Sequence, residues 1–213
     1  MIPPPGGPAD VVGVLLAGGL SRRMGGGDKT LGLLGGRSIL SRAVDRLGPQ
    51  VAALVINANG DPARFAAFGL PVAADVVDGY AGPLAGVLTG MEWARAHAPG
   101  CAWIVTAATD APFLPRDLVP RLAAALRAAE ADLACATSGG RDHPVFGLWP
   151  VALAADLRRA VAEEGMRKVD RWTGRYRLAR AEFATAAVDP FFNVNGPADM
   201  AAAAALLARV GEG

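Results

Sequence analysis

The stretch "VVGVLLAGGLSRRMGGGDKT", residues 11–30, decides the fold, because it joins a short apolar run to a glycine-rich, cationic loop. Val11 to Leu16 have the length and composition of a buried β-strand. The glycines that follow leave backbone N–H groups uncovered, and such groups bind anions well in a loop after a strand. Arg22, Arg23 and Lys29 add charge that suits a polyphosphate. The stretch predicts an α/β protein with a phosphate-binding loop, the alternative being a glycine-rich surface loop without a ligand.

Several familiar sites are excluded by their missing motifs. A Walker A loop requires Gly directly before its Lys, whereas Asp28 precedes Lys29 here, and no GxGxxG occurs. The chain also has no Gly-x-Ser-x-Gly, no Cys–His pairing and no HExxH, so covalent and zinc-water catalysis have no candidate residues. Lysine occurs only at positions 29 and 168, which indicates either that the loop needs a compact ammonium group or that its lysine is there by chance. Catalysis by positioning, charge neutralisation and a metal ion fits what is present.

The composition predicts one folded domain with a small-molecule partner. The 213 residues are 52% hydrophobic and 19% charged with a net charge of +1, unlike a disordered chain or a general nucleic-acid binder. We expect a flexible tail at 1–9 and a single domain at 10–213. Cys101 and Cys135 lie in apolar segments and are expected to be reduced thiols. With no signal peptide and no apolar run near the ~18 residues of a membrane span, we expect a cytoplasmic protein with no membrane or nucleic-acid partner.

Apolar runs of strand length alternate with longer helical patterns, which is typical of βαβ units. The predicted fold is therefore a Rossmann-like, three-layer α/β/α sandwich. Its sheet is expected to be mainly parallel, with an antiparallel excursion near residues 133–149. The expected strands are 11–16, 51–58, 71–74, 101–107, 133–137 and 143–149, with strand-like pieces at 181–185 and 191–194. The expected helices are 38–47, 62–68, 84–97, 116–130, 152–164 and 197–210, with a basic amphipathic segment at 167–177.

Glycine, aspartate and asparagine gather just after the first four predicted strands. In an open parallel sheet, ligands bind in the crevice outside the carboxyl ends of the strands. We therefore expect these residues to converge on one edge of the sheet, and we expect the binding site there.

The sequence "LLAGGLSRRMGGGDKTL" resembles the signature of the MobA-like nucleotidyltransferases, with its LAGG, RMGG and DK elements in order. Within that group, the Gly-Gly after Leu-Ala and the doubled Gly after Met24 resemble the molybdenum cofactor guanylyltransferases rather than the cytidylyl branch. The resemblance continues in "VINAN" (55–59), "GPLAG" (82–86) and "TDAPFL" (109–114). It reappears in "RDHP" (141–144), "GMRKV" (165–169) and "NVNGPAD" (193–199). It thus covers nearly the whole chain.

The resemblance implies an activity. A member of this family transfers GMP from GTP to the terminal phosphate of molybdopterin, forms the guanine dinucleotide cofactor and releases pyrophosphate, with Mg²⁺ as cofactor. Transient contact with molybdoenzymes or other cofactor-biosynthesis proteins is also implied.

It also implies roles for particular residues. Arg23, Lys29 and Asp110 are expected to be catalytic, and Asp110 is the expected magnesium ligand, which suits the preference of Mg²⁺ for a carboxylate plus substrate phosphates. The acceptor side is expected to use Arg141, Asn193 and Asn195. The expected nucleotide-binding residues are Leu16, Ala17, Gly18, Gly19, Lys29, Asn57, Asp75, Gly82 and Asp110.

Other interpretations of the same residues stay open. Asn57, Asp75 and Asp110 are also ordinary residue types for strand ends and turns, and a lone histidine such as His143 is more often structural. Asn193 and Asn195 flank Val194, so on an extended chain both would face the same way. Alternative functions are a nucleotidyltransferase that uses CTP or a different phosphorylated acceptor, and a non-catalytic protein that delivers nucleotide or cofactor.

Overall fold

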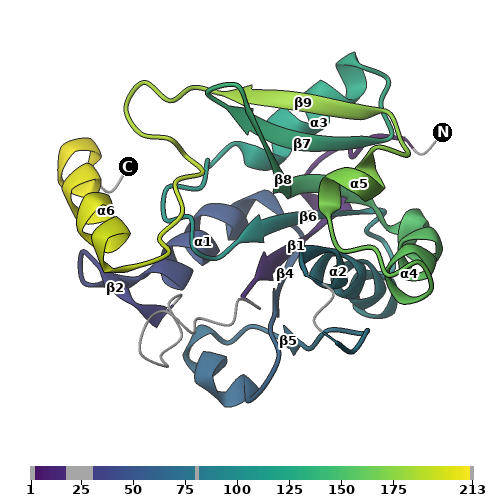
Figure 1. Ribbon diagram of the computed structural model, residues 1–213, viewed down its shortest axis with the longest axis horizontal. Coiled ribbons are helices and arrows are strands. Elements are labelled where there is room, and N and C mark those ends of the chain that lie inside the picture. The colour runs from purple at the N-terminus through teal and green to yellow at the C-terminus, as the bar shows by residue number, and fades with distance from the viewer. Residues whose placement is uncertain (1–2, 18–30, 80–81, 212–213) are drawn as a thin grey trace.

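The computed structural model describes residues 3–17, 31–79 and 82–211, and its centre is a seven-stranded sheet (Figure 1). Strands β5, β4, β1 and β6 run parallel to one another, β8 is antiparallel to both β6 and β7, and β9 is parallel to β7. In sheet order the strands are Val72–Ala73 (β5), Ala53–Asn57 (β4), Val11–Leu16 (β1), Trp103–Ala108 (β6), Arg141–Pro150 (β8), Leu133–Ser138 (β7) and Leu178–Phe183 (β9). The mainly parallel sheet with an antiparallel excursion is confirmed.

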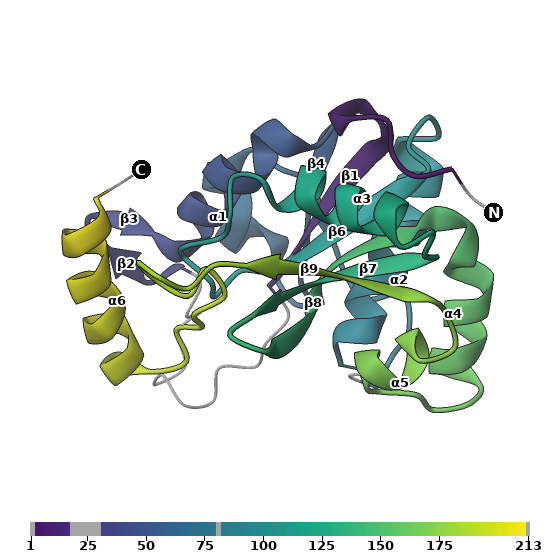
Figure 2. The same cartoon turned by 90° about the horizontal axis from the view of Figure 1, so that it is seen from above.

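Helices cover both faces of the sheet, so the three-layer prediction is also confirmed (Figure 2). One face carries α1 (Ile39–Leu47) and α3 (Leu118–Ala128), and the other carries α2 (Pro83–His97), α4 (Ala154–Ala162) and α5 (Val169–Thr173). Beyond the carboxyl edge, α6 (Pro197–Val210) lies beside a small hairpin of β2 (Leu33–Leu34) and β3 (Arg37–Ser38). The 3₁₀ segments are η1 (Pro8–Asp10), η3 (Gly48–Gln50), η4 (Pro62–Phe68) and η5 (Val151–Leu153).

Local sequence signals explain many element boundaries. The first five residues of β1 are fully buried, as expected of a central parallel strand with helices on both faces. Ser38 caps α1, because its side chain accepts a hydrogen bond from Ser41 N at 3.0 Å. Proline opens both α2 and α6, where its missing N–H is not needed.

The strand predicted at 191–194 is wrong. The backbone N–H groups there bond to separate acceptors rather than to one partner strand: Phe191 N to the Asp189 side chain, Phe192 N to Asp189 O, and Val194 N to Asp110 O. The structure also has the β2–β3 hairpin, which the sequence patterns did not indicate, and only 169–173 of the amphipathic segment 167–177 is helical. At 191–194 the short-range pattern is overridden by a tertiary contact, the bond from Val194 N to Asp110 O.

The start of the chain lies against the body of the fold. Trp103 Nε1 donates to Pro3 O at 2.9 Å, and Arg127 donates to Pro5 O at 3.0 Å. The division into a flexible tail at 1–9 and a domain at 10–213 stays a prediction. Among the described residues, no helix combines the length and apolar character needed to cross a lipid bilayer.

Candidate functional site

The carboxyl ends of β1, β4 and β6 are joined by hydrogen bonds at the point where the strand order reverses. From β1 the chain continues to β4 on one side, and β6 is added on the other, so this is the switch point where α/β sheets bind ligands. Leu16 O accepts from Thr109 N at 3.3 Å and from Thr109 Oγ1 at 3.1 Å. On the other side, Ala17 N donates to Asn57 O at 2.9 Å. The Ala17 N–H thus extends the β1–β4 ladder, and Leu16, Ala17, Asn57 and the Asp110 loop lie together as the sequence predicted.

A network of amides holds the Asp75 carboxylate at the end of β4. Asn57 is 4% exposed, and its Nδ2 donates to Asp75 Oδ1 at 2.9 Å and to Ala73 O at 3.2 Å. Asn59 Nδ2 donates to Asp75 Oδ2 at 2.8 Å, and Asn59 Oδ1 accepts from Asp75 N at 2.9 Å. Within the described residues, each carboxylate oxygen therefore has one bond to protein and keeps acceptor capacity for a ligand.

Asn59 is a further candidate residue that the sequence reasoning missed. It stands two positions after Asn57 in "VINAN", so on an extended chain both amides point to the same side. That alternation was the signal that could have identified it.

Helix α2 approaches this network so closely that any side chain at position 86 would force a neighbouring side chain to shift. An added Cβ on Gly86 would stand 2.5 Å from Asn57 Oδ1 and 2.6 Å from Leu16 Cδ2. Gly86 also went unrecognised as part of the site, although it ends the "GPLAG" segment. The missing side chain lets the helix pack directly against the ends of β1 and β4.

Gly82 forms the entrance to α2. It has a φ of +71°, which favours glycine, and an added Cβ would stand 3.3 Å from the carbonyl oxygen of Arg167. The "GPLAG" and "GMRKV" segments, far apart in the sequence, are therefore neighbours here, as expected if both border one site.

The loop after β6 contacts the segment that precedes α6. Asp110 is half-buried, and its backbone oxygen accepts from Val194 N at 2.8 Å. Val194 is buried among residues of β2, α1 and α6, whereas Asn193 and Asn195 on either side of it are exposed. The structure thus brings both asparagines next to Asp110, although the segment is not a strand.

Arg141 lies at the exposed tip of the β7–β8 hairpin, paired in register with Ser138. No contact joins it to the other candidate residues within the described ranges. The expected roles of Gly18, Gly19, Arg23 and Lys29 fall on residues 18–30, which lie outside the described residues.

The donor chemistry at Asp110 fits a magnesium ion. Across residues 3–17, 31–79 and 82–211 there is no group of three or more His, Cys, Asp or Glu side chains that would form an all-protein metal cage. Mg²⁺ needs no such cage, because it is commonly held by one or two carboxylates together with substrate phosphates and water. A single carboxylate at the end of a central strand matches that requirement.

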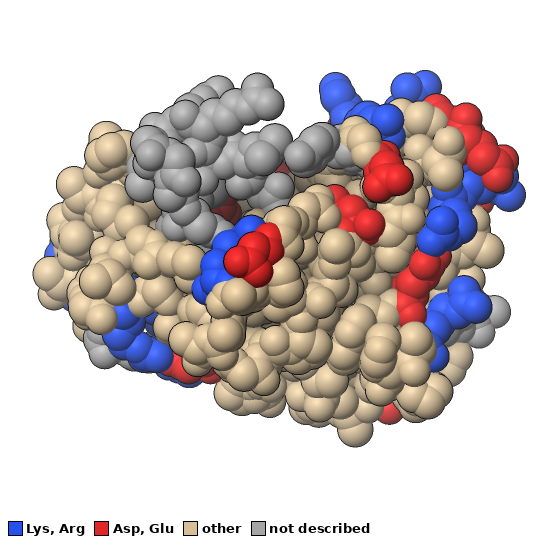
Figure 3. Space-filling view, turned by 90° about the horizontal axis from the view of Figure 1, so that it is seen from below, with Lys and Arg blue, Asp and Glu red and all other residues tan. Residues whose placement is uncertain are grey.

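The charged residues form no broad basic surface on the face seen from below. Basic and acidic side chains alternate along one side of that face, as far as the described residues show (Figure 3). Several such residues form ion pairs, such as Arg158 with Glu92 and Arg175 with Glu164.

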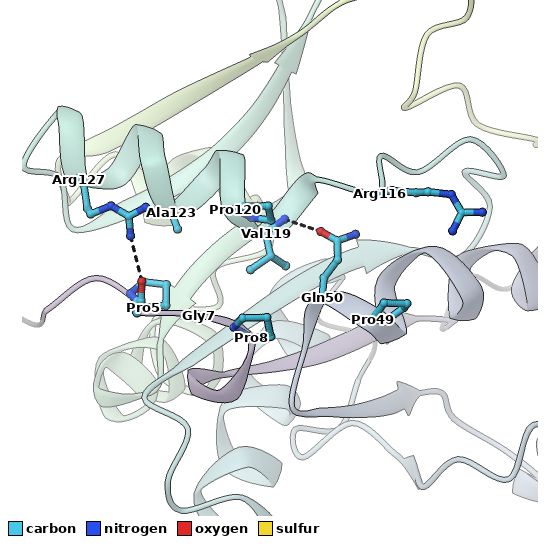
Figure 4. Close-up of a pocket in the computed structure, with 11 residues that line it drawn as sticks. Pro5, Gly7, Pro8, Pro49, Gln50, Arg116, Val119, Pro120, Ala123 and Arg127 are labelled. Atoms are coloured by element: carbon cyan, nitrogen blue, oxygen red, sulfur yellow. Dashed lines mark hydrogen bonds between the residues drawn. The ribbon is translucent and has the colours of Figure 1, made fainter. Parts of the chain in front are cut away.

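A cavity of about 280 Å³ lies elsewhere, among the N-terminal segment, η3 and α3 (Figure 4). Its buried polar side chain, Gln50, already has partners: Nε2 donates to Arg46 O and Pro115 O, and Oε1 accepts from Val119 N. The segments that line it lead into β1 and β4, at the opposite end of the strands from Asn57. It is therefore separate from the candidate site.

Comparisons with known proteins find a matching family model and similar proteins over most of the chain. The family model of the MobA-like NTP transferase domain matches residues 13–180. A protein of Rhodopseudomonas palustris (strain BisB5) named molybdenum cofactor guanylyltransferase is 56% identical over 92% of this chain and 93% of its own. One of the same name from Bradyrhizobium sp. (strain ORS 278) is 54% identical over 93% of each. The structure of molybdopterin-guanine dinucleotide biosynthesis protein A from Archaeoglobus fulgidus shares the fold, with a TM-score of 0.70 at 22% identity over 94% of this chain and 100% of that one.

Proposed function

This chain belongs to the MobA-like NTP transferase family, and on that basis we propose that it transfers GMP from GTP to the terminal phosphate of molybdopterin, with release of pyrophosphate. The observation that carries the proposal is the arrangement at the carboxyl edge. Amide and carboxylate groups suited to a base or ribose lie on one side of Leu16, and the Asp110 loop with Asn193 and Asn195 lies on the other. A nucleotide and an acceptor phosphate could therefore bind next to each other, one on either side of Leu16. The names of relatives that are more than half identical supply the substrate identities.

The Asp75 network supports guanine over cytosine. Guanine presents two adjacent donors, N1–H and the exocyclic amine, which match the two oxygens of a carboxylate. Cytosine presents a donor beside the N3 lone pair, which a carboxylate repels. The amides of Asn57 and Asn59 fix the carboxylate plane from the protein side, so Asp75 is preorganised to accept both guanine donors.

The transfer is proposed to be direct and in line. The acceptor phosphate is already anionic and attacks the α-phosphorus without needing a strong base, while Arg23 and Lys29 stabilise the charge that develops there and on the departing pyrophosphate. Asp110 holds Mg²⁺, which when bound neutralises the phosphate oxygens. Asn193 and Asn195 orient the acceptor phosphate, with Arg141 as a further cation on that side. The backbone from Leu16 to Gly19 borders the triphosphate, and Gly82 allows the turn into α2 to approach it.

The proposal includes a cytoplasmic location, in keeping with two buried, unpaired cysteines. It also includes transient contact with the proteins that receive the product.

The decisive experiment measures pyrophosphate release by the purified protein with molybdopterin, Mg²⁺ and either GTP or CTP. We expect release with GTP, and a loss of several orders of magnitude in turnover for Lys29→Ala and Asp110→Asn. Arg209→Ala, which removes an exposed cation from α6, is the matched control and keeps the native rate. A preference for CTP would overturn the guanylyl assignment, and no release with either nucleotide would favour a non-catalytic delivery protein.

A further inference from the structure

Three polar side chains form a partly buried chain of hydrogen bonds where the β7–β8 hairpin meets the segment before α6. Ser138 is 2% exposed, and its Oγ donates to Asp189 Oδ1 at 2.9 Å. The same oxygen lies 2.7 Å from His143 Nε2. Since the hydroxyl has one proton, already given to the carboxylate, Nε2 of His143 must be the donor in the second bond.

The order of donors excludes a nucleophilic triad. In a Ser-His-Asp triad the serine gives its proton to the histidine, and the carboxylate accepts from the far side of the ring. Here the proton order is His143 to Ser138 to Asp189, and the hydroxyl is buried. The arrangement therefore holds the Asp189 carboxylate in place rather than activating the serine.

The Asp189 carboxylate also holds the backbone turn that follows it. Oδ1 also accepts from Phe191 N at 3.0 Å, and Asp189 O accepts from Phe192 N at 3.0 Å. The ring of Phe191 lies against that of His143, with centroids 4.6 Å apart, and against Phe146 at 4.8 Å. The start of the segment is thus anchored on the hairpin by both polar and aromatic contacts.

The other end of the segment is anchored on the Asp110 loop. Val194 N donates to Asp110 O at 2.8 Å, only three residues after Phe191. Asn193 lies between the two anchors and Asn195 directly after the second. The position of the two asparagines relative to Asp110 therefore depends on both anchors. The anchor on the hairpin consists of the hydrogen bonds among Ser138, His143 and Asp189.

We propose that Ser138, His143 and Asp189 are positioning residues for the acceptor substrate, acting through the segment that carries Asn193 and Asn195. The inference rests on the proposed role of those asparagines. The nucleotide side has its own supports, because Asn57 ends β4 while Asn59 and Asp75 follow β4 and β5, on the other side of β1. Disrupting the hairpin anchor therefore weakens acceptor use and leaves GTP binding unchanged.

The test measures KM for molybdopterin at saturating GTP, KM for GTP at saturating molybdopterin, and GTP affinity by calorimetry. We expect Ser138→Ala and Asp189→Ala to raise KM for molybdopterin by about tenfold, the effect of losing one or two hydrogen bonds. Both variants keep the wild-type affinity for GTP. Asp189→Asn retains an Oδ1 that accepts from Ser138 and Phe191, so it restores most of the acceptor affinity.

Thr137→Val is the matched control. Thr137 precedes Ser138 on β7, is 5% exposed and donates to Glu182, so the change removes a side-chain bond of the same strand without touching Asp189. Urea unfolding of every variant separates a loss of stability from a loss of positioning. If Asp189→Ala does not fold, the comparison of Ser138→Ala with Asp189→Asn still tests the inference. Equal increases in KM for both substrates, or values for Ser138→Ala that match those of Thr137→Val, would overturn the inference.

Two further variants separate this inference from the site assignment. If Asn193→Ala and Asn195→Ala raise KM for molybdopterin but Ser138→Ala and Asp189→Ala do not, the positioning inference alone fails. If the asparagine variants leave that KM unchanged, the acceptor assignment and the inference fail together. Guanylyl transfer itself is tested separately, by the release of pyrophosphate.

Discussion

Replacing Gly86 by alanine tests whether the close approach of α2 to the strand ends is needed for nucleotide binding. The new Cβ would stand 2.5 Å from Asn57 Oδ1, closer than a carbon and an oxygen can approach without a shift. If the Asn57 amide moves away, it loses its bond to Ala73 O and its bond to the Asp75 carboxylate. These bonds contribute about 1 and about 2 kcal/mol, the second being larger because its acceptor is charged. Alanine stabilises a helix by about 1 kcal/mol relative to glycine, which offsets part of this loss. The free energy of unfolding should therefore fall by about 2 kcal/mol.

The effect on binding follows from the same displacement. Asn57 orients Asp75, so we expect Gly86→Ala to weaken GTP binding by about tenfold or more, measured by calorimetry with Mg²⁺. Gly90→Ala is a matched control on the same helix, because its Cβ would stand 2.5 Å from Val14 Cγ2 and would disturb apolar neighbours only. It should lower stability in urea unfolding and leave GTP affinity unchanged. Gly86→Ala protein that is folded and binds GTP as tightly as the wild type, or no more weakly than Gly90→Ala, would refute the reasoning.

Three other changes have expected outcomes. Burial lowers the pKa of His143, so below pH ~6.5 this side chain binds a proton more readily in the unfolded chain than in the folded one. The free energy of unfolding should then fall on acidification, and fall less for His143→Gln, in urea titrations at several pH values. Tyr176 donates its hydroxyl proton to the Asp156 carboxylate at 2.5 Å, so Asp156→Ala, which removes the acceptor, should cost about 2 kcal/mol in the same assay, and a stability equal to wild type would contradict this. Burial raises the pKa of Cys135 to about 11, so this thiol should react with Ellman's reagent at pH ~8 only when the chain is unfolded, and rapid reaction of the native protein would count against its burial.

The parts of the fold that the sequence predicted well are those with local signals. Ser38 marks the start of α1 and Pro83 the start of α2, since a cap or a helix-opening proline acts within one turn. The strand ends after β1, β4 and β6 were predictable because parallel strands in consecutive βαβ units place their carboxyl ends at one edge. This is why Asn57, Asp75 and Asp110 were identified as residues of one edge before any contact between them was known.

What the sequence did not indicate depends on contacts between distant segments. The insertion of β8 between β6 and β7 depends on sheet pairing across about forty residues, which no local pattern encodes. Residues 191–194 have the composition of a strand. Their N–H groups nevertheless bond to separate acceptors, Phe191 N to the Asp189 side chain and Val194 N to Asp110 O, so no strand pairing forms there within the described part of the chain. The need for glycine at position 86 is visible only when the position of Asn57 is known.

The two sides of the carboxyl edge are therefore held by different kinds of structure. On the nucleotide side, Leu16, Ala17 and Asn57 are parts of the sheet ladder, so displacing one of them breaks hydrogen bonds between strands. On the acceptor side, Asn193 stands in a segment without a ladder, held by separate anchors at Asp189 and Asp110. Segments held by few bonds open at lower free energy than central strands, so if Asn193 contacts the acceptor as proposed, this side of the edge should adjust more readily to its ligand. Sequence motifs alone are accordingly a better guide to the nucleotide than to the acceptor, whose recognition depends on how the hairpin and α6 place one short segment.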